Sequence, residues 1–305
     1  MRVLITGATG LVGSNISKKC LAKGYEVNYL TTDREKVKQK DNYKGFFWDP
    51  KNNVIDDECL NKVDVIIHLA GASIAKRWTS SYKEEIIESR VDTANLLFNR
   101  LKATNQSISQ FISASAIGIY PSSFQNLYKE DDQRIDDSFL AEVVEKWEAA
   151  ADQFKDAQTK VAKVRTGLVL AEKGGALQKM KEPADLNLGA GFGTGKQWQS
   201  WIHIEDLANM YLYILENSLD GIYNGVAPNP VTNNELTECI AKQLDKKVWL
   251  PNVPAIALKV ALGDMATVVL SSQLVSSDKI EDTGFEFIYK NLSVNISGDS
   301  FFIRV

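Results

Sequence analysis

Short apolar runs alternate with amphipathic segments along the first half of the chain. Residues 2–6 (RVLIT) form a continuous aliphatic run, which predicts a buried strand, and residues 11–24 follow with helical spacing that ends at Gly24. Because parallel strands are joined by crossovers that usually contain a helix, this alternation predicts an α/β fold with a doubly wound parallel sheet. Further strands are expected at residues 26–31, 45–48, 63–71, 110–120 and 160–170, and helices at residues 80–102 and 138–155.

The alternation loosens after about residue 170. Residues 188–197 (LGAGFGTGKQ) are rich in glycine, which predicts a loop, whereas residues 204–217, 232–244 and 250–265 have helical spacing. Residues 221–226 predict one more short strand.

This change of pattern divides the chain into two expected parts. Residues 1–170 are predicted to form a nucleotide-binding domain of the NAD(P) type, with returns to its sheet near residues 202–228. Residues 171–305 are predicted to form a smaller C-terminal substrate domain, a lid over the carboxyl edge of the sheet.

Composition narrows the possible partners. The chain is 44% apolar and 24% charged with a net charge of −4, which is ordinary for a globular protein and gives no reason to expect nucleic acid or an anionic membrane as partner. Its three cysteines and two histidines form no metal-binding spacing, so no metal is expected. No segment resembles a secretory signal or approaches the roughly 18 uncharged apolar residues of a membrane span. We therefore expect a cytoplasmic protein.

Three glycines mark the first turn as a phosphate site. Gly7, Gly10 and Gly13 follow the first strand directly and open the first helix. In this setting the first glycine permits a tight turn, the second lets the backbone approach a pyrophosphate, and the third allows the helix to pack closely on the strand. The pattern predicts a Rossmann-like dinucleotide site with phosphates at the helix N-terminus. The alternative is a tight turn without a ligand.

The end of the second strand bears on the choice of cofactor. An acidic residue there binds ribose hydroxyls and selects NAD, whereas a nearby arginine accepts the 2′-phosphate of NADP. Thr32, Asp33 and Arg34 follow one another here, so both signals are present. Arg34 is able to form a charge-assisted fork to a phosphate. The alternative is that Asp33 caps the next helix and Arg34 is solvated.

Seven stretches, taken in order, resemble one family. They are TGATGLVG, DVIIHLAGASIAKRW, SRVDTANLL, FISASAIGIY, VRTGLVLAEKGGAL, GTGKQWQSWIHIEDL and GIYNGVAPNPVTNNEL. Together they are similar to the atypical extended short-chain dehydrogenase/reductases, in the group labelled epimerase family protein or cell-division-inhibitor-like, within the NAD-dependent epimerase/dehydratase superfamily. The likeness runs from Met1 to about Leu292. It implies an extended Rossmann domain, a small C-terminal substrate domain and NADP(H) rather than NAD(H).

The resemblance also implies which residues contact the cofactor. The family's usual arginine at the end of the second strand corresponds to Thr32, so a preference for NADP requires Arg34 to take its place. Related reductases dimerise through the helices expected at residues 80–102 and 138–155, which implies a homodimer. The other implied cofactor contacts are Gly7, Thr9, Gly10, Leu11, Val12, Leu69, Ala70, Gly71, Arg90 and Ser113.

The helix expected at residues 138–155 lacks the family's usual acid–base pair. Active short-chain reductases use a tyrosine hydroxyl to move the proton, with a lysine four residues later that lowers its pKa, and a serine on the fifth strand that orients the substrate. Ser115 matches the serine, but Leu140 and Val144 stand at the tyrosine and lysine positions. Neither side chain is able to transfer a proton.

Other residues are candidates for the missing role, each with a plainer alternative. Tyr120 and Tyr128 lie in the loop after the fifth strand, where a half-buried packing role is the alternative. Glu142 lies on the anomalous helix and is either a buried proton donor or a solvated residue. Ser115 is alternatively bonded to backbone, and His203 is alternatively a structural residue at a helix start. Trp78, Trp198 and Trp201 line either a substrate pocket or the core.

Two functions fit these observations. The first is an NADP(H)-dependent oxidoreductase or epimerase that acts on a small carbonyl or sugar-type substrate with a rearranged proton donor, with Ser115 and Tyr120 as the candidate catalytic residues. The second is a catalytically silent regulator that senses NADP(H) and acts through a protein partner. The lid-like second part favours the first function, by analogy of fold.

Overall fold

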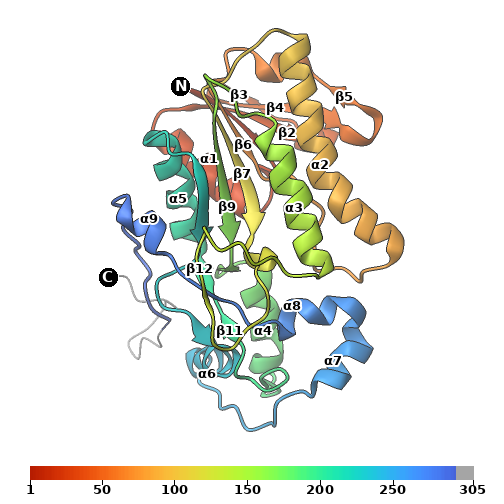
Figure 1. The fold of residues 1–305 in the computed structure, drawn as a ribbon, viewed down its shortest axis with the longest axis vertical. Coiled ribbons are helices and arrows are strands. Elements are labelled where there is room, and N and C mark those ends of the chain that lie inside the picture. The colour runs from red at the N-terminus through yellow and green to blue at the C-terminus, as the bar shows by residue number, and fades with distance from the viewer. Residues whose placement is uncertain (293–305) are drawn as a thin grey trace.

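The computed structural model describes residues 1–292 of the chain, and a nine-stranded, mostly parallel sheet lies at its centre (Figure 1). Its order is β13-β9-β7-β6-β1-β2-β4-β3, with β5 paired to β4, so the predicted Rossmann-like α/β fold is confirmed. The strands are β1 (Arg2–Thr6), β2 (Glu26–Thr31), β3 (Gln39–Lys40), β4 (Tyr43–Asp49), β5 (Val54–Ile55), β6 (Val65–His68), β7 (Gln110–Ala116), β9 (Lys160–Thr166) and β13 (Gly221–Gly225).

Helices cover both faces of this sheet. Val3 and Ile5 pack toward α1 (Leu11–Ala22) and α5 (Ile204–Glu216), whereas Leu4 packs toward α2 (Ser80–Ala103) and α3 (Phe139–Asp152). Neighbouring side chains of one strand point to opposite faces, and here both faces are buried. This is why the strand reads as a continuous apolar run rather than as an alternating one.

The predicted strand over residues 160–170 is wrong in one respect, because it breaks at Gly167. The amide of Gly167 bonds to Gly225, and a Cβ at Gly167 would overlap the carbonyl of Ser200. Past this close crossing the chain leaves the sheet as β10 (Leu168–Leu170), which pairs with β12 (Trp201–His203). The glycine therefore marks the exit from the central sheet.

The rest of the second half forms a smaller layer below the carboxyl edge of the sheet (Figure 1). β13 returns from this half to pair with β9. The helix expected at residues 250–265 begins only at Ala255, after Pro251 and Pro254. The other elements of this half are α4 (Gly175–Asp185), β11 (Trp198–Gln199), β14 (Val231–Thr232), α6 (Asn233–Gln243), α7 (Ala255–Leu262), α8 (Ala266–Leu270), β15 (Leu274–Val275), which pairs with β8 (Leu127–Tyr128), and α9 (Asp278–Asp282).

A buried carboxylate holds the last described segment in place. Asp206, on the first turn of α5, is fully buried and accepts the backbone N–H groups of Ile288 (2.9 Å) and Tyr289 (2.8 Å). The ring of Tyr289 lies 3.8 Å from that of His203, centroid to centroid. Burial raises the pKa of Asp206, and the two N–H groups offset that cost. Among residues 1–292, no helix has both the length and the apolar character needed to span a bilayer.

Candidate functional site

The glycine turn has the geometry of a phosphate cradle. Gly7 adopts a left-handed backbone (φ +67°), and its carbonyl accepts the amide of Gly10 at 3.0 Å. A Cβ at Gly13 would lie 2.7 Å from Cα of Ala8 and closer still to the carbonyl of Gly7, so only glycine lets α1 approach β1 here. Gly7 and Gly13 thus have the local roles that their spacing predicts, the tight turn and the close packing of the helix on the strand.

The start of α1 is prepared for an anion. Its N-cap is Gly10, which offers no side-chain acceptor to the first-turn N–H groups, and the first turn holds no acidic residue. Those N–H groups, which include the amides of Leu11 and Val12, have no partner within the helix. Free N–H groups and the positive end of the helix dipole fit the phosphates of a dinucleotide. Thr9 lies exposed in the same turn.

A buried histidine supports the loop that follows β6. Oγ1 of Thr6 accepts the backbone N–H groups of Leu69 (2.9 Å) and Ala70 (3.0 Å) and lies 3.0 Å from Nδ1 of His68. On its other side, Nε2 of His68 lies 3.2 Å from Oγ1 of Thr93. Since the Thr6 oxygen already accepts two bonds, its proton goes to Nδ1, which assigns the ring proton to Nε2. Neutral His68 therefore supports the loop of residues 69–71, which the family resemblance implies to contact the cofactor.

Acid is expected to destabilise the protein through His68. Complete burial lowers the pKa of His68 from 6.5 to about 4, so between these values the unfolded chain binds the proton more tightly. The stability that neutral His68 contributes is complete above the pKa of the unfolded chain and is lost as the pH falls toward the pKa of the folded protein. Between about pH 7 and pH 5 this loss lowers the free energy of unfolding by about 2 kcal/mol. Urea unfolding of wild-type protein and His68→Asn at both pH values measures this difference. Equal pH dependence in the two proteins would contradict it.

Arg90 is a buried cation behind the same loop. Its Nη1 donates to the carbonyl of Ile86 (2.8 Å) and its Nη2 to that of Ala72 (3.2 Å), and Cζ lies 4.8 Å from the centre of the Trp147 ring. Among residues 1–292 it forms no ion pair, and its Nε has no hydrogen-bond partner. A Cβ at Gly71 would lie 3.0 Å from Cζ, so the guanidinium packs directly against this glycine. Burial lowers the pKa of Arg90 to about 10. A buried cation without a counter-charge suits a neighbouring anion.

At the end of β2, Asp33 and Arg34 have different tasks. The carboxylate of Asp33 accepts the amide of Glu35 at 3.0 Å and lies 3.3 Å from Nζ of Lys36. Asp33 therefore caps the helical turn that follows it, which is the alternative given above for this residue. The guanidinium of Arg34 instead lies over the ring of Phe47, with Cζ 3.7 Å from its centre. Thr32 is exposed beside them. The arginine is thus held by an aromatic platform at the edge of the predicted ribose site.

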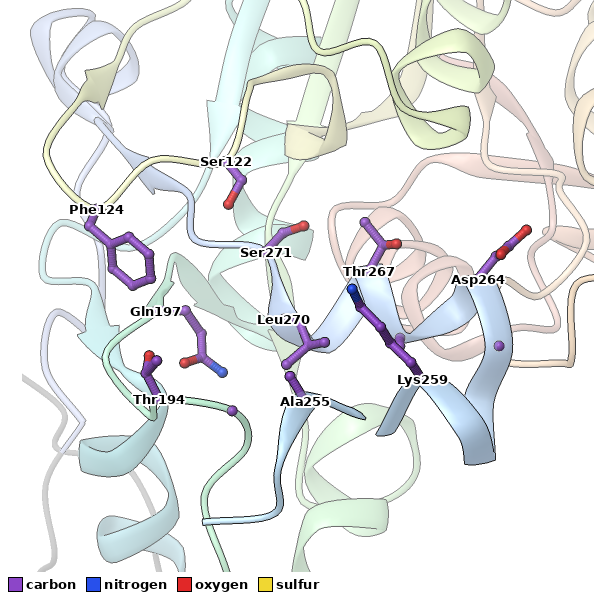
Figure 2. A pocket seen from close by; sticks show the side chains of 13 residues that line it. Ser122, Phe124, Thr194, Gln197, Ala255, Lys259, Asp264, Thr267, Leu270 and Ser271 are labelled. Atoms are coloured by element: carbon purple, nitrogen blue, oxygen red, sulfur yellow. The ribbon is translucent and has the colours of Figure 1, made fainter. Parts of the chain in front are cut away.

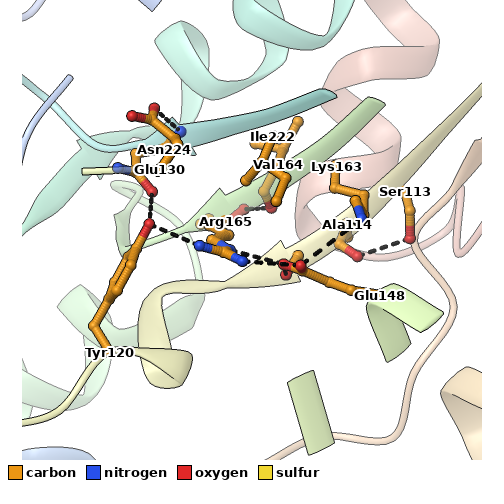
Figure 3. A network of polar contacts seen from close by, with 12 residues as sticks. Ser113, Ala114, Tyr120, Glu130, Glu148, Lys163, Val164, Arg165, Ile222 and Asn224 are labelled. Carbon is orange, nitrogen blue, oxygen red and sulfur yellow. Dashed lines mark hydrogen bonds and ion pairs between the residues drawn. The ribbon is translucent and has the colours of Figure 1, made fainter. Parts of the chain in front are cut away.

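Ser115 belongs to a buried network of charged side chains, of which Figure 3 shows Glu148, Arg165 and Lys163. Its Oγ donates to Oε1 of Glu148 at 2.6 Å, so the alternative of a backbone bond is wrong. Arg165 donates to both oxygens of Glu148, from Nε at 2.8 Å and from Nη2 at 3.0 Å. Lys163 donates to Asp152 at 2.7 Å and lies 3.9 Å from Glu148. Two carboxylates and two cations therefore balance between α3 and β9.

Tyr120 lies at the far end of this network (Figure 3). Its side chain is fully buried, its hydroxyl donates to Oδ1 of Asn224 at 2.9 Å, and Nη1 of Arg165 donates to it at 3.0 Å. Burial raises the pKa of Tyr120. Tyr120 therefore packs inside the fold and does not line the cavity described below.

Among the cofactor candidates, Ser113 is also buried, and its Oγ donates to the carbonyl of Ala114 at 2.8 Å.

Leu140 and Val144 fill the positions of the missing pair with packed apolar side chains. Val144 is buried in a cluster with Tyr120 and Tyr128, and Leu140 packs against Gly118. Four residues after Val144, on the same side of α3, comes Glu148. The polar function of this helix face thus lies one turn further along. The expected residues did not include Glu148, although this spacing pointed to it.

The remaining candidates have structural surroundings. Glu142 is half exposed and pairs with Lys146 at 2.7 Å, so the solvated alternative applies. Tyr128 is buried and stacked on Tyr120. His203 is the N-cap of α5 and accepts the amide of Glu205 at 3.3 Å. Of the three tryptophans, Trp78 and Trp201 are buried and Trp198 partly so, and none lines the cavity.

A cavity of about 680 Å³ opens between the two halves of the chain (Figure 2). Ser122 and Phe124 come from the segment after β7, Thr194 and Gln197 from the glycine-rich loop, and Lys259 from α7. Its volume lies within the range of small-molecule sites. Lys259 forms no ion pair among the described residues, whereas Asp264 at the rim pairs with Lys83 at 2.6 Å. The cavity therefore offers hydroxyl groups, one aromatic ring and one unpaired cation.

Comparison with known proteins identifies two family models that match this chain and several similar proteins. A model described as the NAD dependent epimerase/dehydratase family matches residues 3–138, and one described as a domain of unknown function (DUF1731) matches residues 253–294. The chain is 36% identical over 298 residues to an epimerase family protein of Staphylococcus aureus (strain MRSA252), which covers 95% of this chain and 96% of the relative.

Two solved structures are also similar over almost the whole chain. The human epimerase family protein SDR39U1 (isoform 2), crystallised with NADPH, superposes with a TM-score of 0.84 at 30% identity and covers 96% of this chain and 97% of its own. A nucleoside-diphosphate sugar epimerase of Corynebacterium glutamicum superposes with a TM-score of 0.75 at 32% identity and covers 95% of this chain and 56% of its own.

Proposed function

Since the chain belongs to the epimerase family of NAD-dependent epimerase/dehydratase proteins, we propose that it binds NADP(H) and acts as an oxidoreductase or epimerase on a small carbonyl or sugar-type substrate. The observation that carries this proposal is the glycine cradle at the N-terminus of α1, combined with a human relative of the same fold that was crystallised with NADPH. The cavity between the two halves supports a small substrate.

Different residues around the cradle would contact different parts of the cofactor. Gly7, Gly10 and the amides of Leu11 and Val12 would hold the phosphates, with Thr9 in the same turn. The segment from Leu69 to Gly71, supported by His68 and backed by Arg90, would line the next part of the cofactor, with Ser113 on the neighbouring strand. Arg34 on its Phe47 platform would take the 2′-phosphate.

Replacing Arg34 by alanine is expected to weaken NADPH binding by roughly tenfold to 100-fold, because charge-assisted contacts to a phosphate are worth about 1.5–3 kcal/mol. Binding of NADH, which lacks the 2′-phosphate, should change little. Titration of nicotinamide fluorescence measures both affinities. The control is Lys155→Ala, which removes an exposed cation from the segment before β9, a strand that lies on the far side of β1 from β2. An equal loss for NADPH and NADH would count against a 2′-phosphate role.

Ser115 and Glu148 are buried like Tyr120 and do not line the cavity, so they would exchange a proton only with a substrate that reaches Ser115 at the end of β7. NADPH, when bound, would supply a hydride for a carbonyl carbon, and the substrate oxygen would then require a proton from the protein. The Ser115 hydroxyl points its hydrogen at Glu148, which leaves its lone pairs to accept a proton from a substrate hydroxyl in the oxidative direction. Its own proton would pass to Glu148 in the same step, and the reverse sequence would serve reduction. Arg165 would position the carboxylate.

A second function, a silent regulator that senses NADP(H) through a protein partner, is favoured by one observation. Leu140 and Val144 are packed into apolar clusters, and the hydroxyls of both Ser115 and Tyr120 have partners inside the fold. A protein of this kind would bind the cofactor without using it.

Two measurements in sequence separate the functions. The first is titration of the purified protein with NADPH, where binding in the micromolar range or tighter is expected. The second follows the absorbance of NADPH with a panel of aldehydes, ketones and sugar nucleotides, using wild-type protein and Ser115→Ala. Turnover that the substitution abolishes supports the enzyme, tight binding without turnover supports the regulator, and no binding contradicts both.

A further inference from the structure

The side-chain amide of Gln197 is buried against the cavity and held in one orientation. Gln197 is 2% exposed, and its Nε2 donates to the carbonyls of Phe192 (3.0 Å) and Val269 (3.2 Å). Turning the amide over would place its oxygen against these two carbonyls, so the positions of Nε2 and Oε1 are assigned by their surroundings. The backbone carbonyl of Gln197 also accepts the amide of Asn233 at 3.0 Å. The side chain is thus fixed in place.

The oxygen of this amide is the atom left for a ligand. Within residues 1–292, Oε1 of Gln197 accepts no hydrogen bond, and it is not closed off from water as the unpartnered Nε of Arg90 is. Since Gln197 lines the cavity, its Oε1 opens into that space. A fixed acceptor selects ligands that bring an O–H or N–H group to it, because a ligand without one would leave the acceptor unpaired.

The hydroxyl groups of the cavity have hydrogens to donate. Oγ of Ser122 accepts the amide of Ser272 at 3.0 Å, and Oγ1 of Thr194 accepts that of Lys196 at 3.3 Å. Neither hydroxyl donates to another group within the described part of the chain. An oxygen that already accepts from the backbone offers its hydrogen to a ligand. The cavity therefore presents one fixed acceptor and several donors, which suits a ligand with several hydroxyl groups.

One positive charge of the cavity is not balanced. Lys259 and Asp264 are the charged residues among those that line it. Asp264 pairs with Lys83 of α2 at 2.6 Å, whereas Lys259 forms no ion pair within residues 1–292. Figure 2 shows Lys259 across the view from Gln197. The ammonium group of Lys259 thus suits one anionic group, on the part of a ligand that lies away from the Gln197 contact.

An aromatic ring completes the lining. The side chain of Phe124 is 54% exposed, and its backbone carbonyl accepts Nε1 of Trp198 at 3.2 Å. Figure 2 shows the ring on the same side of the view as Gln197. A ring that is open to the cavity on a tethered backbone gives a flat apolar surface, against which the C–H face of a sugar ring is able to pack.

We propose that this cavity takes a hydroxylated compound with a single anionic group, a carboxylate or a phosphate. Lys259 holds the anion, Oε1 of Gln197 accepts a hydroxyl and Phe124 packs against the carbon skeleton. This rests on the proposed function, because it names the substrate class for that function. Ser115 does not line the cavity, so the groups held here belong to the end of the substrate remote from the reacting carbon.

The charge of the lining favours a sugar acid or a sugar phosphate over a sugar nucleotide. The diphosphate of a nucleotide carries more negative charge than one lysine balances. It would also approach Asp264, the other charged residue of the lining. A single anionic group matches the one unpaired cation.

Three sugars that differ only at carbon 6 test the proposal: glucose, glucuronate and glucose 6-phosphate. Calorimetric titration of the full-length protein at low salt should show both anionic sugars binding about tenfold more tightly than glucose, because a charge-assisted bond is worth more than a neutral one. The tighter of the two distinguishes carboxylate from phosphate. Lys259→Met should lower the affinity for both anions to that for glucose and leave the affinity for glucose unchanged. Lys196→Met removes an exposed lysine of the same glycine-rich loop that does not line the cavity, and this matched control should bind like wild type.

Gln197→Met tests the second contact. It should lower the affinity for all three sugars by a similar factor, roughly fivefold, because the hydroxyl contact is common to them. Unchanged NADPH binding by the variants shows that the chain remains folded.

Equal binding of the three sugars, or no binding of any, would overturn the proposal. So would a preference for the anions that survives Lys259→Met, or sugar affinities that Gln197→Met leaves unchanged. NADPH binding without sugar binding would contradict this inference alone, whereas sugar binding without NADPH binding would contradict the proposed function instead.

Discussion

Replacing Gly13 by alanine is expected to lower the free energy of unfolding by about 3 kcal/mol and to weaken NADPH binding by roughly 100-fold. The atoms nearest to the new Cβ all belong to the backbone, the carbonyl of Gly7 and the Cα of Ala8 at 2.7 Å, so movement of a side chain does not relieve the overlap. Helix α1 must then shift away from β1, which displaces the N–H groups that would hold the phosphates. Urea unfolding and nicotinamide fluorescence measure the two effects.

Gly24→Ala is the matched control for this substitution. Gly24 follows α1 with φ +78°, and a Cβ there meets no atom within 4 Å. Only the backbone strain of an alanine in the left-handed region is added, about 1 kcal/mol. NADPH affinity should remain that of the wild type. If Gly13→Ala bound NADPH normally, the cradle would not be the cofactor site.

Glu148→Ala is expected to lower the free energy of unfolding by about 3–5 kcal/mol. It leaves the buried guanidinium of Arg165 without its two carboxylate bonds, and a buried charge that loses its partner retains its desolvation cost. Burial by itself would lower the pKa of Arg165, but the bonds and charge of Glu148 outweigh it and raise that pKa. Chemical denaturation measures the loss.

Glu142→Ala provides the comparison on the same helix. Glu142 pairs with Lys146 at half-exposed positions, and removing such a surface pair should cost only about 0.5 kcal/mol. The double substitution Glu148→Leu with Arg165→Met removes both charges, and we expect it to be more stable than Glu148→Ala alone. A double variant less stable than the single one would contradict this account of the network.

The sequence predicted the central sheet because its strands are buried on both faces. Runs such as residues 2–6 admit few interpretations, and the glycine spacing at Gly7, Gly10 and Gly13 depends on local geometry alone. The break at Gly167 was not predictable in this way. It depends on the carbonyl of Ser200, which only the folded chain brings near.

The candidate site shows the same division between local and distant causes. Tyr120 was expected near the substrate from its place after a strand, but position along a chain does not give the direction of a side chain, and the structure buries it. Glu148 could have been predicted to share a helix face with Val144. Its partner Arg165 depends on the register of β7 against β9, which pairs Ser115 with Arg165 and has no local signal.

The return of β13 to the central sheet bears on how the protein can move. Because the chain leaves the sheet after β9 and comes back to pair with the same strand, the two halves are interleaved rather than joined by a single hinge. A rotation of one half as a rigid body would have to break the β9–β13 ladder. Any widening of the cavity is therefore expected to come from the segments that border it, the glycine-rich loop and the chain after β7, moving locally against a fixed frame.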